Sequence, residues 1–388
     1  PVGGGQFLPC ARLIFAPGAA APHKFYGHRK WFSGRNYVSI VRARLVRIDG
    51  QRCFERLAIA VHDLGDPLPV TNGAEDGRLI RWIGGGGGDD DIRLMMTVSV
   101  APIPHNMIRQ LVWRVHPVTL QPHDKQMIAR AYQHDRRSTE KNYVVFALKN
   151  RLLVLTTSVP APNLVDGITG VIASKENGLH GLITINDATR RVLGLKRHFP
   201  LRGSAPPLAV DAHRWLVAMH VSVEGIWHCL DVGFDAHITD EDTEPPFWAA
   251  VQGTYSNNTR YANRMQDEAI TYHKRYWSMI VEVTHDEHDE RLVATRATPF
   301  FLPPGRFHRR AVITFVVGLT TVPDDSDTLL LSYGEADVTC RCDAMSKAQI
   351  DANLLPIDAF AQMNDKARLF QRDLFAFRGA QRIAVPAP

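Results

Sequence analysis

Short segments rich in Val, Ile, Leu, Thr and aromatic residues recur along this chain, each bounded by Gly, Pro, Asn or Asp. These segments are 37–48, 93–100, 143–157, 208–223, 278–283, 311–319 and 328–333. Such runs between turn-forming residues are typical of β-strands. The 28 Gly and 24 Pro fit the many tight turns that short strands need. The sequence therefore predicts an all-β protein, and a sandwich, a barrel and a propeller all fit this pattern.

The C-terminal segment departs from the strand pattern. Apolar residues recur there at helical spacing between 345 and 378, in two pieces separated at Pro356. We predict a helical extension over residues 345–388, which packs on the β domain or on a protein partner. Residues 1–30 are predicted to be an N-terminal extension, and residues 31–344 the β domain.

Charge and cysteine content exclude several classes of protein. The 45 Lys and Arg against 40 Asp and Glu give a net charge of +5, and the basic residues are interrupted by acids, so we do not expect nucleic-acid binding. No run of about 18 apolar residues predicts a membrane-spanning helix. Neither a disulfide framework nor a structural zinc site is expected, since the five cysteines lack CxxC spacing. Nothing in the sequence predicts a compartment.

Other polar segments have two interpretations each. The glycine run 84–88 with the aspartates 89–91 is expected to be a solvated hairpin tip, because no GKS/T follows it as in a phosphate-binding loop. Residues 284–290 contain His, Asp and Glu that could bind a divalent metal, but a charged hairpin turn is the preferred interpretation. Residues 234–276 are expected to form a long excursion, and Asn257 begins a glycosylation sequon.

The first of four polar clusters that precede strand-like runs is Glu75-Asp76-Gly77-Arg78. Strand side chains alternate between faces, so Asp76 and Arg78 are expected on one face and Glu75 on the other. An Asp beside an Arg is held ionised and oriented, which suits a group that handles a proton. A turn with a surface ion pair is the structural alternative.

The other three clusters follow along the chain. They are Glu140-Lys141-Asn142, the segment Gly203-Ser204-Ala205-Pro206-Pro207 that leads to His220, and Tyr333-Gly334-Glu335-Ala336-Asp337. Prolines donate no ladder hydrogen bonds, so the third cluster should begin or flank a strand. Each cluster alone is more often structural than functional, whereas their joint occurrence favours a function.

In this order, the four clusters resemble the successive blade motifs of the β-mannoside phosphorylases and related mannosyltransferases. That family has a five-bladed β-propeller fold of the glycoside-hydrolase type. The resemblance covers roughly residues 30–345 and is carried by the motifs alone. It implies a five-bladed β-propeller over residues 31–344, with the strand starts of its blades meeting at one sugar-sized funnel.

The resemblance also implies roles for individual residues. Asp76 would be the general acid, acting through a sugar hydroxyl while phosphate attacks the anomeric carbon with inversion. Glu75, Arg78 and Asn142 would bind the substrate, Arg78 also orienting Asp76.

The other roles concern phosphate and the glycosyl unit. Lys141 and His220 would bind phosphate by stabilising negative charge. Tyr333 and Asp337 would hold the glycosyl unit. The implied partner is a carbohydrate, with inorganic phosphate or a sugar 1-phosphate as co-substrate and with no cofactor or metal.

Two departures from the family pattern support an alternative. The family has Pro where this chain has Gly77, and phosphorolytic relatives often carry a basic residue after the paired prolines, where this chain has Leu208 and Ala209. Water as the nucleophile stays open. The alternative function is a catalytically inactive propeller that serves as a glycan-binding or structural subunit of an assembly.

Overall fold

A computed structural model of the 388-residue chain describes most of the predicted strands. The described residues are 6–7, 10–15, 35–48, 51–62, 74–81, 92–99, 108–127, 142–148, 151–155, 164–166, 172–174, 180–193, 201–225, 273–286, 288, 291–304, 314–322, 325–335, 339–371 and 373–378. Most of them lie in strands, which confirms the all-β prediction. The glycine run at 84–88, Asn257 and nearly all of the excursion at 234–276 lie outside the described residues.

The described strands form five antiparallel sheets, numbered here in chain order. Sheet 1 contains β1 (Gln6–Phe7), β2 (Cys10–Phe15), β3 (Arg35–Ile48) and β4 (Gln51–His62). Sheet 2 contains β5 (Ala74–Arg81), β6 (Ile92–Ser99), β7 (Ile108–Val115) and β8 (Pro122–Met127). Sheet 3 contains β9 (Val144–Leu148), β10 (Arg151–Leu155), β11 (Leu164–Asp166) and β12 (Ile172–Ser174).

The remaining two sheets come from the second half of the chain. Sheet 4 contains β13 (Arg202–Gly203), β14 (Leu208–Ala209), β15 (Arg214–Gly225), β16 (His273–Asp286), β17 (Arg291–Ala297) and β21 (Leu355–Pro356). Sheet 5 contains β18 (Thr314–Val322), β19 (Asp325–Glu335) and β20 (Thr339–Ser346). In sheets 2, 3 and 5, each strand pairs with the next one along the chain. Antiparallel strands that are neighbours in the chain can be joined as hairpins, without a crossover connection.

Consecutive sheets pack face to face through shared hydrophobic cores. Ile40 of sheet 1 lies in one buried cluster with Leu94 of sheet 2. Met95, on the opposite face of β6, lies in the next cluster with Val154 of sheet 3. Adjacent strand residues point to opposite faces, so one strand contributes to the cores on both sides of its sheet.

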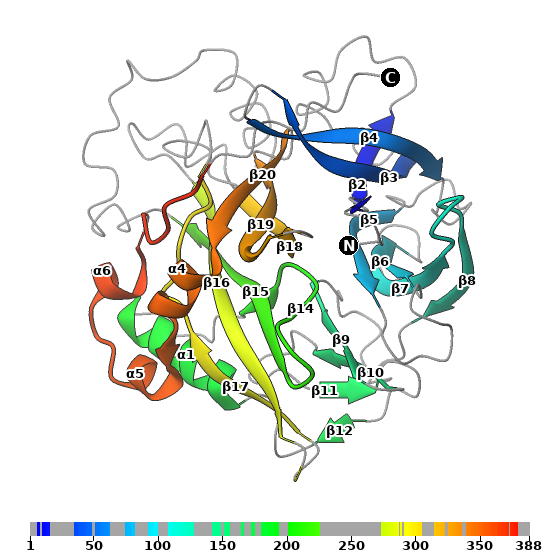
Figure 1. Ribbon diagram of the computed structural model, residues 1–388. Helices are drawn as coiled ribbons and strands as arrows, with labels where there is room; N and C mark the ends of the chain where they lie inside the picture. The colour runs from blue at the N-terminus through cyan, green and yellow to red at the C-terminus, as the bar shows by residue number, and fades with distance from the viewer. Residues whose placement is uncertain are drawn as a thin grey trace, which may run out of the picture.

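The same arrangement continues from sheet 3 to sheet 5. Phe146 of β9 packs edge-on against Trp215 of β15, with ring centroids 6.0 Å apart. On the other face of sheet 4, Ile280 shares a core with Leu331 of sheet 5. Figure 1 shows sheets 1, 2 and 3 following one another from blue through cyan to green, with sheets 4 and 5 in green, yellow and orange beside them.

Sheet 5 in turn packs against sheet 1. Leu45 of β3 and Phe54 of β4 pack against buried residues of β18–β20, which are Val322, Leu330, Cys342 and Ala344. Burial raises the pKa of the Cys342 thiol to about 12. The shared cores thus link the five sheets in the cyclic order 1–2–3–4–5–1.

Short helices follow sheet 5 in the C-terminal segment: α4 (Lys347–Asn353), α5 (Ile357–Ala361) and α6 (Lys366–Leu369). Ser346 and Gln349 form a capping box that starts α4, and the short strand β21 separates α4 from α5 at the predicted break. Phe370, after α6, stacks on Phe300 with ring centroids 5.0 Å apart. The described part of this segment packs on sheets 4 and 5.

One helix, α1 (His180–Val192), was not predicted from the sequence. Its buried residues Leu182, Ile185, Ala188 and Val192 do follow helical spacing. Ile and Thr in the segment lower its intrinsic helix propensity, so the pattern is weak on propensity alone. Packing against β17 and α5 supplies the stabilisation that propensity does not.

The strands on either side of residues 287–290 form an antiparallel pair, in line with the preferred hairpin interpretation. Strands β16 and β17 pair directly, with Asp286 opposite Arg291. Among the described residues, no group of three or more His, Cys, Asp or Glu side chains could hold a metal ion. None of the helices described is long and apolar enough to cross a membrane.

Candidate functional site

Arg78 of β5 joins the starts of three sheets. Its guanidinium donates to the Tyr143 carbonyl oxygen (2.8 Å) and to Asn142 Oδ1 (2.9 Å). Both residues lie immediately before β9. It also donates to the carbonyl oxygen of Gly203 in β13, at 3.3 Å. Arg78 is only 4% exposed. A planar guanidinium presents several donors in fixed directions, which suits it to bridging three acceptors.

Two backbone features allow sheets 3 and 4 to meet at Arg78. Asn142 has a φ of 60°, a left-handed conformation that Asn tolerates better than most residues. The Gly203 N–H donates to the Asn142 carbonyl oxygen at 3.0 Å. A Cβ on Gly203 would lie 2.3 Å from Val144 Cγ2 and 2.8 Å from the Asn142 carbonyl oxygen. Only glycine permits this close approach of the two segments of the backbone.

The residue after Gly203 connects this junction to His220. Ser204 Oγ lies 2.7 Å from Nδ1 of His220, and both side chains are fully buried. The His220 ring packs edge-on against Phe315 of β18, with centroids 4.8 Å apart, and lies 5.4 Å from the Tyr276 ring. Residues of sheets 4 and 5 therefore surround the imidazole.

Tyr333 of β19 is also fully buried. Its hydroxyl hydrogen-bonds the Pro304 carbonyl oxygen and the Asp343 carboxylate. A Cβ on the next residue, Gly334, would meet no atom within 4 Å in the described part of the chain. Tyr333 therefore has partners within the protein itself, and its predicted contact with a glycosyl unit stays a prediction.

Several predicted site residues have side chains outside the described part of the structure. Glu75 and Asp76 are described only as backbone in β5, and Lys141 and Asp337 are not described. The pairing of β5 with β6 shifts register between Glu75 and Arg78, which marks a β-bulge there. A bulge interrupts the strict alternation from which Asp76 was placed on the face of Arg78. The role of each residue in this group stays a prediction.

The structure thus brings three of the four predicted clusters into contact through Arg78, Asn142 and Gly203. Sequence analysis missed two parts of this junction: the carbonyl acceptors and the Ser204–His220 hydrogen bond. The first left no side-chain signal, because backbone carbonyls belong to every residue. The second could have been proposed from Ser204 itself, which lies within the third cluster.

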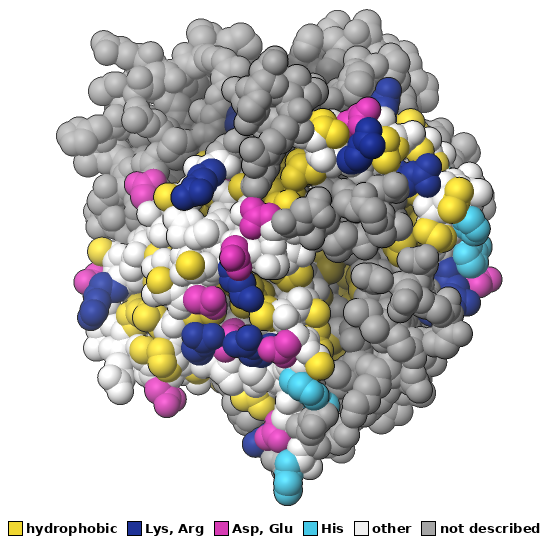
Figure 2. Space-filling view, viewed as in Figure 1, with side chains coloured by type: hydrophobic (Ala, Val, Ile, Leu, Met, Phe, Trp, Pro, Cys, Tyr) yellow, Lys and Arg dark blue, Asp and Glu magenta, His cyan; other side chains and the backbone are white. Residues whose placement is uncertain are grey.

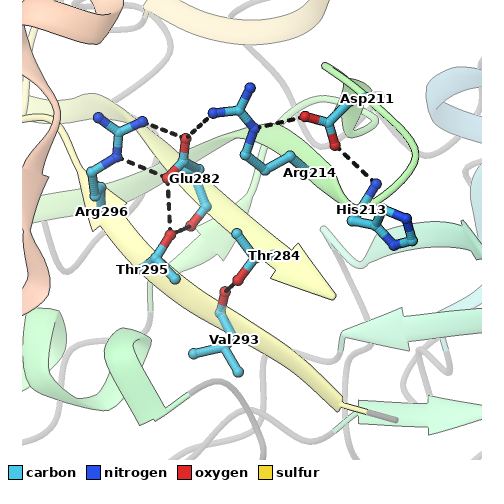
Figure 3. Close-up of polar contacts among 8 residues, drawn as sticks. All are labelled: Asp211, His213, Arg214, Glu282, Thr284, Val293, Thr295 and Arg296. Atoms are coloured by element: carbon cyan, nitrogen blue, oxygen red, sulfur yellow. Dashed lines mark hydrogen bonds and ion pairs between the residues drawn. The ribbon is translucent and has the colours of Figure 1, made fainter. Parts of the chain in front are cut away.

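A separate polar network lies across β15, β16 and β17 (Figure 3). Glu282 accepts from Arg296 Nε and Nη2 at 2.8 and 2.6 Å, and from Thr295 Oγ1 at 3.0 Å. Arg214 lies 3.7 Å from Glu282 and forms an ion pair with Asp211 at 2.9 Å. Figure 2 shows acidic and basic side chains interspersed on the face seen there. Ion pairing between strands accounts for this network without a ligand.

Electrostatics in the network favour ionised carboxylates. The hydrogen bond from Arg296, with lesser help from Thr295 and Arg214, lowers the pKa of Glu282 despite its burial. The pKa of Asp211 is lowered mainly by the backbone N–H of His213. Both groups are therefore anions at neutral pH.

No known protein family matches the sequence, and no curated protein matches it. Among solved structures, the chain is similar to MPT-1, a GDP-Man-dependent mannosyltransferase from Leishmania mexicana, with 10% sequence identity, a TM-score of 0.36 and coverage of 79% of each chain.

Proposed function

We propose that the five sheets are the blades of a five-bladed β-propeller. The support is the cyclic order of the shared cores, in which sheet 5 packs on sheet 1. A closed ring of sheets leaves only short, protected edges. Contacts of β5 with β2 of sheet 1 and with β18 of sheet 5 agree with edge strands that converge near an axis.

We further propose that the protein is a carbohydrate-active enzyme of the β-mannoside phosphorylase or mannosyltransferase type. The observation that carries this proposal is the Arg78 junction, in which motifs more than 60 residues apart meet at one point. A buried guanidinium, an amide and an imidazole beyond Ser204 are groups suited to sugar hydroxyls and phosphate. Asn142 and Tyr143 of the junction immediately precede β9, and a propeller gathers its binding groups at such strand starts.

The proposed reaction is a single displacement at the anomeric carbon. A phosphate oxygen forms a bond to that carbon as the glycosidic C–O bond breaks, and the configuration inverts. The departing oxygen takes the proton of Asp76, relayed through a sugar hydroxyl. Lys141 and His220 would bind the phosphate, while Glu75, Arg78, Asn142, Tyr333 and Asp337 would bind the sugar.

The test is release of sugar 1-phosphate from a panel of β-linked manno-oligosaccharides with phosphate, run beside synthesis in reverse. We expect turnover that Asp76→Asn lowers at least about 100-fold, as loss of a general acid does. Glu55→Gln, an exposed substitution in β4, is the control and should retain turnover. Turnover that survives Asp76→Asn would contradict the assignment of the acid.

Burial of the candidate residues favours a second function. Arg78 is 4% exposed, Asn142 is 7% exposed, and His220 and Tyr333 are fully buried. Side chains that are buried within the protein to this extent suit a structural role. They favour a catalytically inactive propeller that acts as a glycan-binding or structural subunit. For that function, we expect the folded protein to show no turnover in either direction. We also expect calorimetry to detect oligosaccharide binding, or the protein to be isolated as a subunit of a larger assembly.

A further inference from the structure

Ser204 and His220 form a fixed pair. The 2.7 Å contact joins Ser204 Oγ to Nδ1 of the imidazole, and neither side chain is exposed. The Ser204 N–H donates to the Ala218 carbonyl oxygen at 3.0 Å, which holds its backbone against β15. His220 lies within β15, opposite Ser278 of β16. Backbone pairing on both sides therefore sets the distance between the hydroxyl and the ring.

The proton in this hydrogen bond can be assigned by counting donors and acceptors. If Nδ1 carried the hydrogen, it would donate to Ser204 Oγ, and the serine hydroxyl hydrogen would need another acceptor. Within the described residues, His220 is the one hydrogen-bond partner of Ser204 Oγ. A buried hydroxyl that keeps its hydrogen unused loses its hydration without compensation. Donation from Ser204 to Nδ1 avoids this cost.

We propose that Ser204 is a positioning residue that holds neutral His220 in the tautomer with its proton on Nε2. Donation from the serine hydroxyl occupies the lone pair of Nδ1, so the ring hydrogen resides on Nε2. The Phe315 and Tyr276 rings restrict rotation of the imidazole. The inference rests on the proposed function, in which His220 binds phosphate: an Nε2–H is a donor, as a phosphate oxygen requires.

The test reads the tautomer directly. In the full chain labelled with ¹⁵N-histidine, the two-bond ¹⁵N–¹H pattern of His220 is identified by its disappearance in His220→Gln. At about pH 8, where an unperturbed imidazole is neutral, we expect a protonated Nε2 and an unprotonated Nδ1. In Ser204→Ala, we expect a mixture of tautomers. The phosphorolytic kcat/KM should fall by about 10- to 100-fold, as misplacement of a reacting group does.

Ser278→Ala is the matched control. Ser278 is also fully buried and lies opposite His220, and its Oγ has no hydrogen-bond partner among the residues that the structure describes. We expect this variant to keep the wild-type tautomer and a kcat/KM within about two-fold of wild type, as an energetically neutral truncation should.

Two results would overturn the inference: a protonated Nδ1 in the wild-type protein, or an unchanged tautomer in folded Ser204→Ala. If Ser204→Ala does not fold, the wild-type spectrum alone still tests whether the ring proton of His220 is on Nε2. Absence of turnover with the expected tautomers would count against the proposed function and leave the Ser204–His220 assignment standing.

Discussion

The Arg78 junction and the Glu282 network use arginine in opposite ways. Arg78 is almost fully buried and donates to two backbone carbonyls and an amide from sheets 3 and 4. The Glu282 network lies within sheet 4, and Arg214 and Arg296 remain 40% and 33% exposed beside one buried carboxylate. The first arrangement ties different sheets together, whereas the second ties neighbouring strands of one sheet. Loss of an arginine should therefore have consequences of very different size.

The largest effect is expected from Arg78→Ala. Each of three buried acceptors loses a charge-assisted hydrogen bond worth roughly 1.5–3 kcal/mol, so we expect the free energy of unfolding to fall by about 3 kcal/mol or more. Arg78→Lys should recover little, because one ammonium cannot match the planar fork. Chemical denaturation measures both. Arg56→Ala, an exposed change in β4, is the control and should shift stability by at most about 0.5 kcal/mol.

Gly203→Ala tests the close approach beneath the same junction. The added Cβ would lie 2.8 Å from a backbone oxygen, which cannot move aside without disturbing sheet 3. We expect a loss of about 1–3 kcal/mol, typical of overpacking. Gly334→Ala is the matched control, because its Cβ would meet no atom of the described residues within 4 Å. Equal effects of the two variants in thermal unfolding would contradict the packing described for Gly203.

Glu282→Gln tests the second network and its pH dependence. Removing the charge leaves Arg296 partly able to reach water, so we expect a loss of roughly 1–3 kcal/mol at pH 7, below the range for a fully buried pair. The folded-state pKa of Glu282 is lowered, so its contribution is present above the ordinary glutamate pKa and is lost as pH falls through the folded-state value. The difference from wild type should therefore be constant near neutrality and shrink in acid.

The smallest effect is expected from Glu55→Gln. Glu55 pairs with Arg44, as Glu282 does with Arg296, but its side chain is 46% exposed and that of Arg44 is 52% exposed. Solvent screens such a pair, so we expect a change of at most about 0.5 kcal/mol in chemical denaturation. A loss as large as that of Glu282→Gln would show that burial does not separate the two pairs.

Much of the strand content could be predicted from the sequence, because side-chain patterns report it directly. All seven predicted segments contain described strands, although 143–157 covers two strands, β9 and β10, and 208–223 covers β14 and most of β15. Helix α1 was missed since its stabilisation comes from packing on β17. The helical stripe after residue 345 was correct in position, but it forms three short helices.

The candidate site was predictable only as a set of side chains. Arg78, Asn142 and His220 could be chosen by type and order, and the structure places Arg78 on Asn142 and His220 beside Ser204. The bulge between Glu75 and Arg78 was not predictable, because strand alternation assumes an uninterrupted ladder. Carbonyl acceptors at Tyr143 and Gly203 depend on backbone position alone, which a residue pattern does not encode.

The buried thiol of Cys342 makes the seam between sheets 5 and 1 observable in real time. A thiol with a pKa of about 12 carries almost no thiolate at neutral pH, so an alkylating reagent reacts with it only after the surrounding core opens. Mass spectrometry can follow labelling of the peptide that contains Cys342. Labelling faster than global unfolding would show that sheets 5 and 1 separate before the other described sheets unfold. Labelling at the global rate would show that the five sheets open as one cooperative unit.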